Sequence, residues 1–179
     1  QTGEPVVNAF RKCPNLVTAP PNHKMYREKS RMLMDFLRTY TKKIEQVSVD
    51  ECYMDFTELA SRYPTPADGA MEMKEEVKKR FGFTVNIGIS NNKLLAKMAS
   101  DFEKPDKVHT LFPSEIPEKM WPLPVRDLLF LGKASEQKLL RAGIKTIGDM
   151  AKSDEAEIRQ LLGDKNGRQL YRYANGIDD

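Results

Sequence analysis

The segment 44–57 constrains the fold most, because two short apolar runs in it flank the adjacent acids Asp50 and Glu51. In the second run apolar side chains occupy every second position: Cys52, Met54 and Phe56. This alternation is typical of a half-buried strand. The segment therefore predicts a β-hairpin with an acidic tip.

Helical patterns surround this hairpin. Apolar residues three or four positions apart predict amphipathic helices at 26–43, 70–81 and 94–102, and alternating apolar residues predict a strand at 83–89. The residues up to Pro14 show no full helix or strand pattern. The first half is therefore predicted to be an α+β unit.

The second half of the chain follows a proline-rich connection. Prolines at positions 113, 117, 122 and 124 interrupt any regular pattern and predict a domain boundary. Beyond it no strand alternation remains, and glycines separate helical stretches at 128–140, 146–151 and 158–174. This half is predicted to be a small all-α domain.

Composition excludes several protein classes. The chain has 179 residues, 40% of them hydrophobic and 31% charged, which argues against disorder and fibres. No apolar run approaches the roughly 18 residues of a membrane span. Cys13 and Cys52 stand far apart, so neither a disulfide framework nor a zinc site is indicated, and a cytoplasmic location is expected. The net charge of +3 is too small to indicate nucleic-acid binding by itself.

The acids of the hairpin tip are the first candidates for chemistry. Adjacent carboxylates supply the oxygen ligands that Mg²⁺ prefers, and substrate phosphates complete its coordination. An ordinary polar turn is the alternative, and on spacing alone it is the better interpretation. The frame 48–55 favours the metal site, because it sets Asp50 and Glu51 between apolar strands where we expect them to be screened from solvent.

A second candidate feature lies at 86–105, where the strand runs into a helix that begins with Ser and Asn residues. Free backbone N–H groups there could bind phosphate, and Lys93, Lys97 and Lys104 add positive charge. Lysines on such helices are more often simply solvated. We single out Lys104, because Pro105 ends the helix and determines where the lysine side chain emerges.

The third feature is a helix-hairpin-helix pattern at 123–149, with Gly132 and Lys133 at its turn. Thr146 and Asp149 have the spacing of a capping box. Such a turn lets backbone N–H groups approach a DNA phosphate, although a plain helical bundle would use the same glycines and caps.

Together these motifs resemble the Y-family, or translesion, DNA polymerases, nearest to the bacterial DNA polymerase IV branch. The matching motifs are 48–55, 88–101, Lys104-Pro105 and the helix-hairpin-helix, and they occur in the family's order. The resemblance implies an antiparallel palm sheet backed by helices, followed by a small helical thumb. Residues 1–19 would be the tail of the fingers, 20–111 most of the palm, and 112–179 the thumb.

The resemblance also implies roles for individual residues. Asp50 would bind both catalytic Mg²⁺ ions, and Glu51 would lie beside it near the primer 3′ hydroxyl. Lys104 would reach the phosphates of the incoming deoxynucleoside triphosphate. Gly132 and Lys133 would contact the backbone of primer-template DNA. The implied reaction is two-metal phosphoryl transfer.

The chain departs from the family pattern in several places. It has neither the D-x-D-x-F-F segment that supplies a further metal-binding Asp nor the Tyr-x-x-Arg of the fingers, and it has no DNA-binding domain after the thumb. We therefore expect a piece of a longer enzyme that is inactive alone. A sliding clamp is a further partner that the resemblance implies, through regions outside this chain. Phe130 occupies the position of the first hairpin Gly, which puts close phosphate approach in doubt.

Two other functions remain in competition. The chain could be a noncatalytic DNA-binding or polymerase-accessory protein, but such a protein has no reason to keep two repelling carboxylates side by side. A palm-like fold used for another nucleotidyl transfer, such as cyclisation, fits the helix-hairpin-helix less well.

Overall fold

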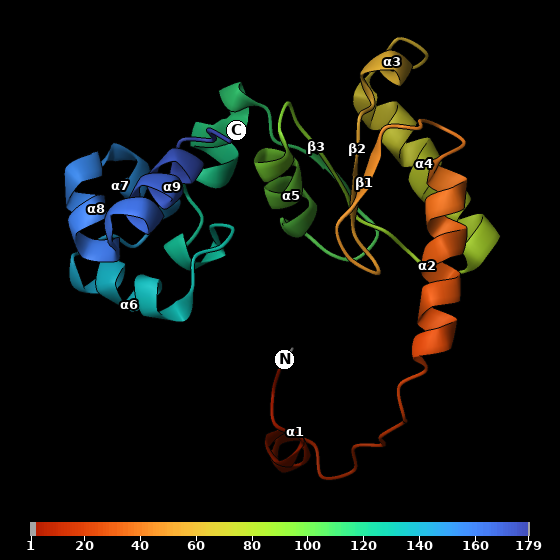
Figure 1. The fold of residues 1–179 in the computed structure, drawn as a ribbon, viewed down its shortest axis with the longest axis horizontal. Helices are drawn as coiled ribbons and strands as arrows, with labels where there is room; N and C mark the ends of the chain where they lie inside the picture. The colour runs from red at the N-terminus through yellow and green to blue at the C-terminus, as the bar shows by residue number, and fades with distance from the viewer. Residues whose placement is uncertain (1–2, 179) are drawn as a thin grey trace.

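The computed structural model describes residues 3–178, and Figure 1 shows the arrangement of their helices and strands. The helices are α1 (Val6–Lys12), α2 (His23–Leu37), α3 (Thr57–Ala60), α4 (Pro66–Phe81), α5 (Lys93–Asp101), α6 (Lys133–Arg141), α7 (Ile147–Lys152), α8 (Glu155–Leu162) and α9 (Asp164–Ala174). The strands are β1 (Ile44–Gln46), β2 (Cys52–Met54), β3 (Ile87–Ile89) and β4 (Val108–Thr110). Short 3-10 and π-helical turns connect β4 to α6. Within the described range, no helix is both long enough and apolar enough to cross a membrane.

The predicted hairpin is present. β1 and β2 pair antiparallel, with Ile44 opposite Met54 and Gln46 opposite Cys52. At its tip the backbone N–H groups of Val47 and Ser48 both donate to the carbonyl of Glu51, at 3.0 and 3.2 Å. The tip is therefore a closed turn that holds the two acids at the end of the strands.

The second strand pair differs from the expectation of an antiparallel sheet. β3 and β4 are parallel, with Ile87 opposite Val108, because α5 returns the chain to the edge at which β3 begins. A Cβ atom at Gly88 would overlap the backbone carbonyl oxygen of Ala96, so α5 packs directly on β3. The mixture of helices with small sheets, followed by an all-α half, is confirmed.

Two hydrophobic cores hold these elements. The first joins α2 and α4 to the strands through buried Leu33, Met34, Phe36, Leu37, Met73 and Val77. The second is built from the helical second half, but it also contains Leu94, Leu95, Met98 and Ala99 of α5. The apolar face of α5 therefore packs beyond the proline-rich boundary predicted at 112–124, and the domain limits stay predictions.

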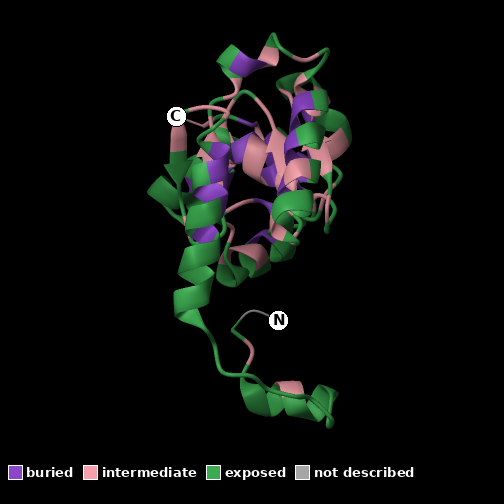
Figure 2. Cartoon of the chain, turned by 90° about the vertical axis from the view of Figure 1, so that its right-hand side faces the viewer, coloured by how far each residue is buried: buried purple, intermediate pink, exposed green. Residues whose placement is uncertain are grey.

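The sequence pattern missed α1, which none of its neighbours buries. The residues of α1 are exposed or only partly buried, and the segment 13–22 that follows has no helix or strand. Figure 2 shows α1 and the first half of α2 as almost entirely exposed. A helix without a buried face needs no apolar periodicity, so the sequence carries no such signal for α1.

Capping determines where several helices begin. Thr65 and Asp68 form a capping box at α4, and Thr146 and Asp149 form the predicted one at α7. In each box the side chains and backbone N–H groups satisfy one another, which is why the helix begins at that residue.

The capping box of α7 yields a test of stability. Asp149→Ala should lower the free energy of unfolding by about 1 kcal/mol, because the carboxylate accepts the backbone N–H groups of Thr146 and Lys145, at 2.9 and 3.0 Å. These hydrogen bonds hold the pKa of Asp149 below its ordinary value of 3.8. The stabilisation is therefore complete above that value and is lost as the pH falls through the lower folded-state pKa.

Urea unfolding across this pH range measures the difference between Asp149→Ala and the unaltered chain. Asp127→Ala is the matched control, since the ion pair of that exposed acid within residues 3–178 is a 3.7 Å contact with its neighbour Arg126, and it should change stability by less than about 0.5 kcal/mol. An equal loss in both variants, or a loss that does not shrink in acid, would contradict the capping argument.

Candidate functional site

Asp50 and Glu51 project from the hairpin tip, where Ser48 organises the backbone. The Ser48 hydroxyl donates to Asp50 Oδ1 at 2.7 Å and accepts the backbone N–H groups of Asp50 and Glu51 at 3.3 and 3.1 Å. Both acids are exposed, so the expectation that they are screened from solvent is wrong for these residues. The tip extends beyond the strands, and α5 reaches it through the side chain of Lys97.

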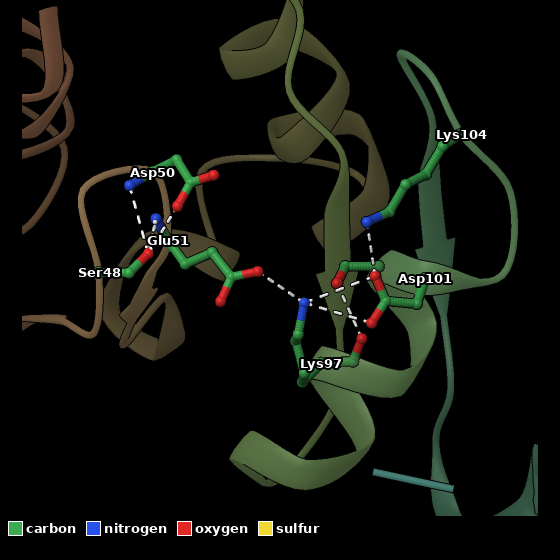
Figure 3. A network of polar contacts seen from close by, with 7 residues as sticks. Ser48, Asp50, Glu51, Lys97, Asp101 and Lys104 are labelled. Atoms are coloured by element: carbon green, nitrogen blue, oxygen red, sulfur yellow. Dashed lines mark hydrogen bonds and ion pairs between the residues drawn. The ribbon is translucent and has the colours of Figure 1, made fainter. Parts of the chain in front are cut away.

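Four side chains of alternating charge run from this tip along α5 (Figure 3). Glu51 Oε1 lies 2.7 Å from Lys97 Nζ, and Lys97 Nζ lies 3.2 Å from Asp101 Oδ2. Asp101 Oδ1 in turn lies 2.7 Å from Lys104 Nζ. We call Glu51, Lys97, Asp101 and Lys104 the charge row.

The inner members of the charge row stabilise one another's ionised forms. Burial lowers the pKa of Lys97, but the hydrogen bond to Glu51 and the charge of Asp101 outweigh it, and the pKa is raised. Burial raises the pKa of Asp101, but the contacts with Lys104 and Lys97 outweigh it, and the pKa is lowered. Both groups are therefore ionised at neutral pH.

A cavity of about 370 Å³ brings the predicted site residues together. Its lining includes Asp50, Glu51, Lys97 and Lys104. A larger cavity of about 970 Å³ is lined by Lys93 and the start of α5 but not by Asp50, Glu51 or Lys104. The two cavities share lining residues from both strand pairs: Tyr53, Met54, Ile87 and Gly88. They lie between the β1–β2 and β3–β4 pairs, which are not paired with each other in the described residues.

The acids fit part of a metal site. Residues 3–178 hold no group of three or more His, Cys, Asp or Glu side chains placed to share a metal ion. Asp50 and Glu51 nevertheless offer carboxylate oxygens, and Mg²⁺ is commonly held by one or two carboxylates together with water and substrate phosphates. The donor chemistry therefore suits Mg²⁺, with the remaining ligands to be supplied by other groups.

The predicted DNA-contacting residues lie elsewhere. Gly132 precedes α6 and Lys133 begins it, both are exposed, and no side chain caps this helix end. Phe130 adopts a left-handed backbone with φ of 64° and is 73% exposed, which explains why glycine suits this position. Figure 1 shows α6 on the far side of α5 from the β1–β2 hairpin.

The sequence analysis missed Asp101 and Ser48 as members of the site. Asp101 stands four residues after Lys97 and three before Lys104, a spacing that places charges together on a helix face. This spacing of charges could have been recognised in the sequence. No pattern in the sequence indicates the role of the Ser48 hydroxyl, because serine is common in any turn.

Removing the hydroxyl of Ser48 tests its role in the tip. Ser48→Ala should speed hydrogen exchange at the amides of Asp50 and Glu51 about fivefold, because each loses an acceptor worth about 1 kcal/mol. Exchange measured by NMR or mass spectrometry checks this, and the amides of α7 serve as an internal control that should not change. Unchanged exchange at the tip would mean that the turn is held by its backbone hydrogen bonds alone.

Comparison with known proteins identifies the family. A family model described as the impB/mucB/samB family matches residues 1–101, and a model described as the thumb domain of DNA polymerase-iota matches residues 126–178. DNA polymerase IV of Clostridium acetobutylicum is 46% identical over 178 residues, which are 99% of this chain and 44% of that protein. DNA polymerase IV 1 of Bacillus subtilis is 43% identical over 178 residues, covering 99% of this chain and 42% of that protein.

A solved structure agrees with these relatives. The crystal structure of DinB from Sulfolobus solfataricus superposes with a TM-score of 0.84 at 25% identity, covering 97% of this chain and 51% of that one. The chain spans less than half the length of the curated relatives named above. Because the first family model alone covers more than half of its residues, this chain belongs to the impB/mucB/samB family of Y-family DNA polymerases.

Proposed function

We propose that the chain is the palm and thumb portion of a DNA-directed DNA polymerase that extends a primer by translesion synthesis. The observation that carries the proposal is the cavity that brings together Asp50, Glu51 and Lys104. In this proposal residues 1–19 are the tail of the fingers, 20–111 most of the palm and 112–179 the thumb. Primer-template DNA and deoxynucleoside triphosphates are the substrates.

The chemistry requires no protein nucleophile. Asp50 and Glu51 are the residues that would hold Mg²⁺, which when bound lowers the pKa of a primer hydroxyl and neutralises triphosphate charge. Asp50 is oriented by the Ser48 hydroxyl, and Glu51 lies beside it on the face toward Lys97. Lys104 carries an ammonium group at the cavity edge, where it suits the phosphates of an incoming nucleotide.

The thumb portion would bind DNA through phosphates. The exposed start of α6 offers uncapped backbone N–H groups beside Lys133, and such contacts position a duplex without reading its sequence. Phe130 protrudes next to this helix start and restricts how closely a backbone phosphate approaches.

Primer extension by a chimera tests the catalytic proposal. Residues 1–179 would replace the matched segment of DNA polymerase IV from Clostridium acetobutylicum, with which they are 46% identical. Asp50→Ala and Glu51→Ala should each lower the extension rate at least about a thousandfold, because metal ligation contributes several kcal/mol to such reactions. Glu45→Ala is the control: this exposed acid of β1 pairs with Lys93 and should leave the rate nearly unchanged.

A folded chimera that binds primed DNA without extending it would favour the noncatalytic, polymerase-accessory function. A normal rate in Asp50→Ala or Glu51→Ala would mean that the two acids form an ordinary polar turn and bind no catalytic metal.

Salt dependence tests the DNA-binding proposal on the chain itself. Binding of a labelled primer-template, followed by fluorescence anisotropy, should weaken with salt at a logarithmic slope of about −0.9 per phosphate contacted. Lys133→Ala should flatten that slope by about one contact. Lys79→Ala on α4, whose exposed side chain lies 3.9 Å from Glu76, should leave it unchanged. Equal effects of the two variants would show that the start of α6 makes no specific phosphate contact.

A further inference from the structure

We infer that Lys97 is an internal counter-cation of the metal-binding acids. When a divalent cation binds Glu51, Lys97 pairs with Asp101 instead, and Asp101 then releases Lys104. This inference rests on the proposed function, because it assigns roles to Glu51 and Lys104 in that function. It adds Lys97 and Asp101 as positioning residues that set when Lys104 is available for phosphate.

The starting observation is that Lys97 already occupies the carboxylate of Glu51. Its Nζ lies 2.7 Å from Glu51 Oε1, and its side chain is only 21% exposed against 48% for Glu51. Lys97 is thus the more buried member of the pair, and both side chains line the same cavity. A divalent cation at Glu51 would place positive charge beside this ammonium, and the repulsion favours displacement of Lys97 from the carboxylate.

Asp101 is the acceptor that remains for Lys97. Its Oδ2 is already 3.2 Å from Lys97 Nζ, one helical turn along α5. A small side-chain movement therefore lets the ammonium group of Lys97 pair with Asp101 instead of Glu51. Among the described ion pairs, Asp101 is the carboxylate that Lys97 and Lys104 share. A stronger pair with Lys97 weakens the hold of Asp101 on Lys104.

Lys104 is placed to respond. Its side chain is 56% exposed, its ion pair in the structure is with Asp101 at 2.7 Å, and it lines the same cavity as the acids. A lysine released from Asp101 can turn toward a bound phosphate, whereas the positive charge of the paired lysine is compensated by the carboxylate of Asp101. The charge row therefore favours exposing the phosphate-binding lysine after the acids are occupied.

Chemical labelling of the 179-residue chain tests the inference without requiring activity. A limiting dose of acetic anhydride at neutral pH acetylates amines, and peptide mass spectrometry gives the rate at each lysine. The neutral amine is the form that reacts with the anhydride, and a carboxylate partner holds a lysine in its protonated form, so a released lysine is acetylated faster. Lys93 is the internal control, since it lies on the same helix and pairs with Glu45 outside the charge row.

Glu51→Gln mimics the neutralised acid and needs no metal. It should raise labelling of Lys104 about two- to fivefold, the range that one exposed ion pair contributes, while Lys93 stays constant. Asp101→Asn should raise labelling of Lys104 by a similar factor, since it removes the partner directly.

The decisive comparison is Glu51→Gln made in a Lys97→Met background. The inference requires that labelling of Lys104 no longer rises there, because the coupling passes through Lys97. An equal rise in both backgrounds would show that Glu51 acts on Lys104 through long-range charge, and no rise in either would show that the two groups are independent. Either result overturns the inference.

Adding a divalent cation gives a second test. Mg²⁺ should raise labelling of Lys104 in the unaltered chain. Mn²⁺ binding, followed by electron paramagnetic resonance, should be tighter in the Lys97→Met variant. Weaker or unchanged Mn²⁺ binding in that variant overturns the role of Lys97 as a competing cation. These readouts are independent of the chimera, so a failed polymerase assay and a failed coupling are distinguishable.

Discussion

The packing of α5 is the constraint on which the rest of the structure depends. One face of this helix is buried with the helical second half through Leu94, Leu95 and Met98, and Gly88 of β3 admits its backbone at close range. Beside this face lie Lys97 and Asp101, and Lys97 contacts Glu51 of the hairpin tip. A single helix therefore links the helical half to the acidic tip, and a change in its packing would move the candidate site.

Electrostatics explain how the tip tolerates adjacent acids. Asp50 and Glu51 repel each other, but Asp50 accepts the Ser48 hydroxyl and Glu51 accepts the ammonium of Lys97. Each carboxylate is thus stabilised by a different partner, and exposure to water lowers the repulsion further. The arrangement remains compatible with a metal ion, because neither partner is buried deeply enough to be immovable.

Much of the fold was predictable where one short-range pattern sufficed. The alternation in 52–56 predicted β2, the helical stripes predicted α2, α4 and α5, and the spacing of Thr146 and Asp149 predicted the start of α7. The strand predicted at 83–89 appears only as Ile87–Ile89, although Phe83 and Val85 still pack on the first core. Strand β4 was missed, because three residues carry too little periodicity to be recognised.

The sequence by itself determined the family motifs, the acidic hairpin and the identity of Asp50, Glu51 and Lys104 as candidates, because these depend on residue types at short spacing. Only the tertiary structure decided that β3 and β4 are parallel, that α5 belongs to the second core, and that the acids are exposed. It also decided that Glu51 meets Lys97, residues 46 positions apart in the chain. Contacts of that separation follow from how whole elements pack, and no local pattern of side chains encodes them.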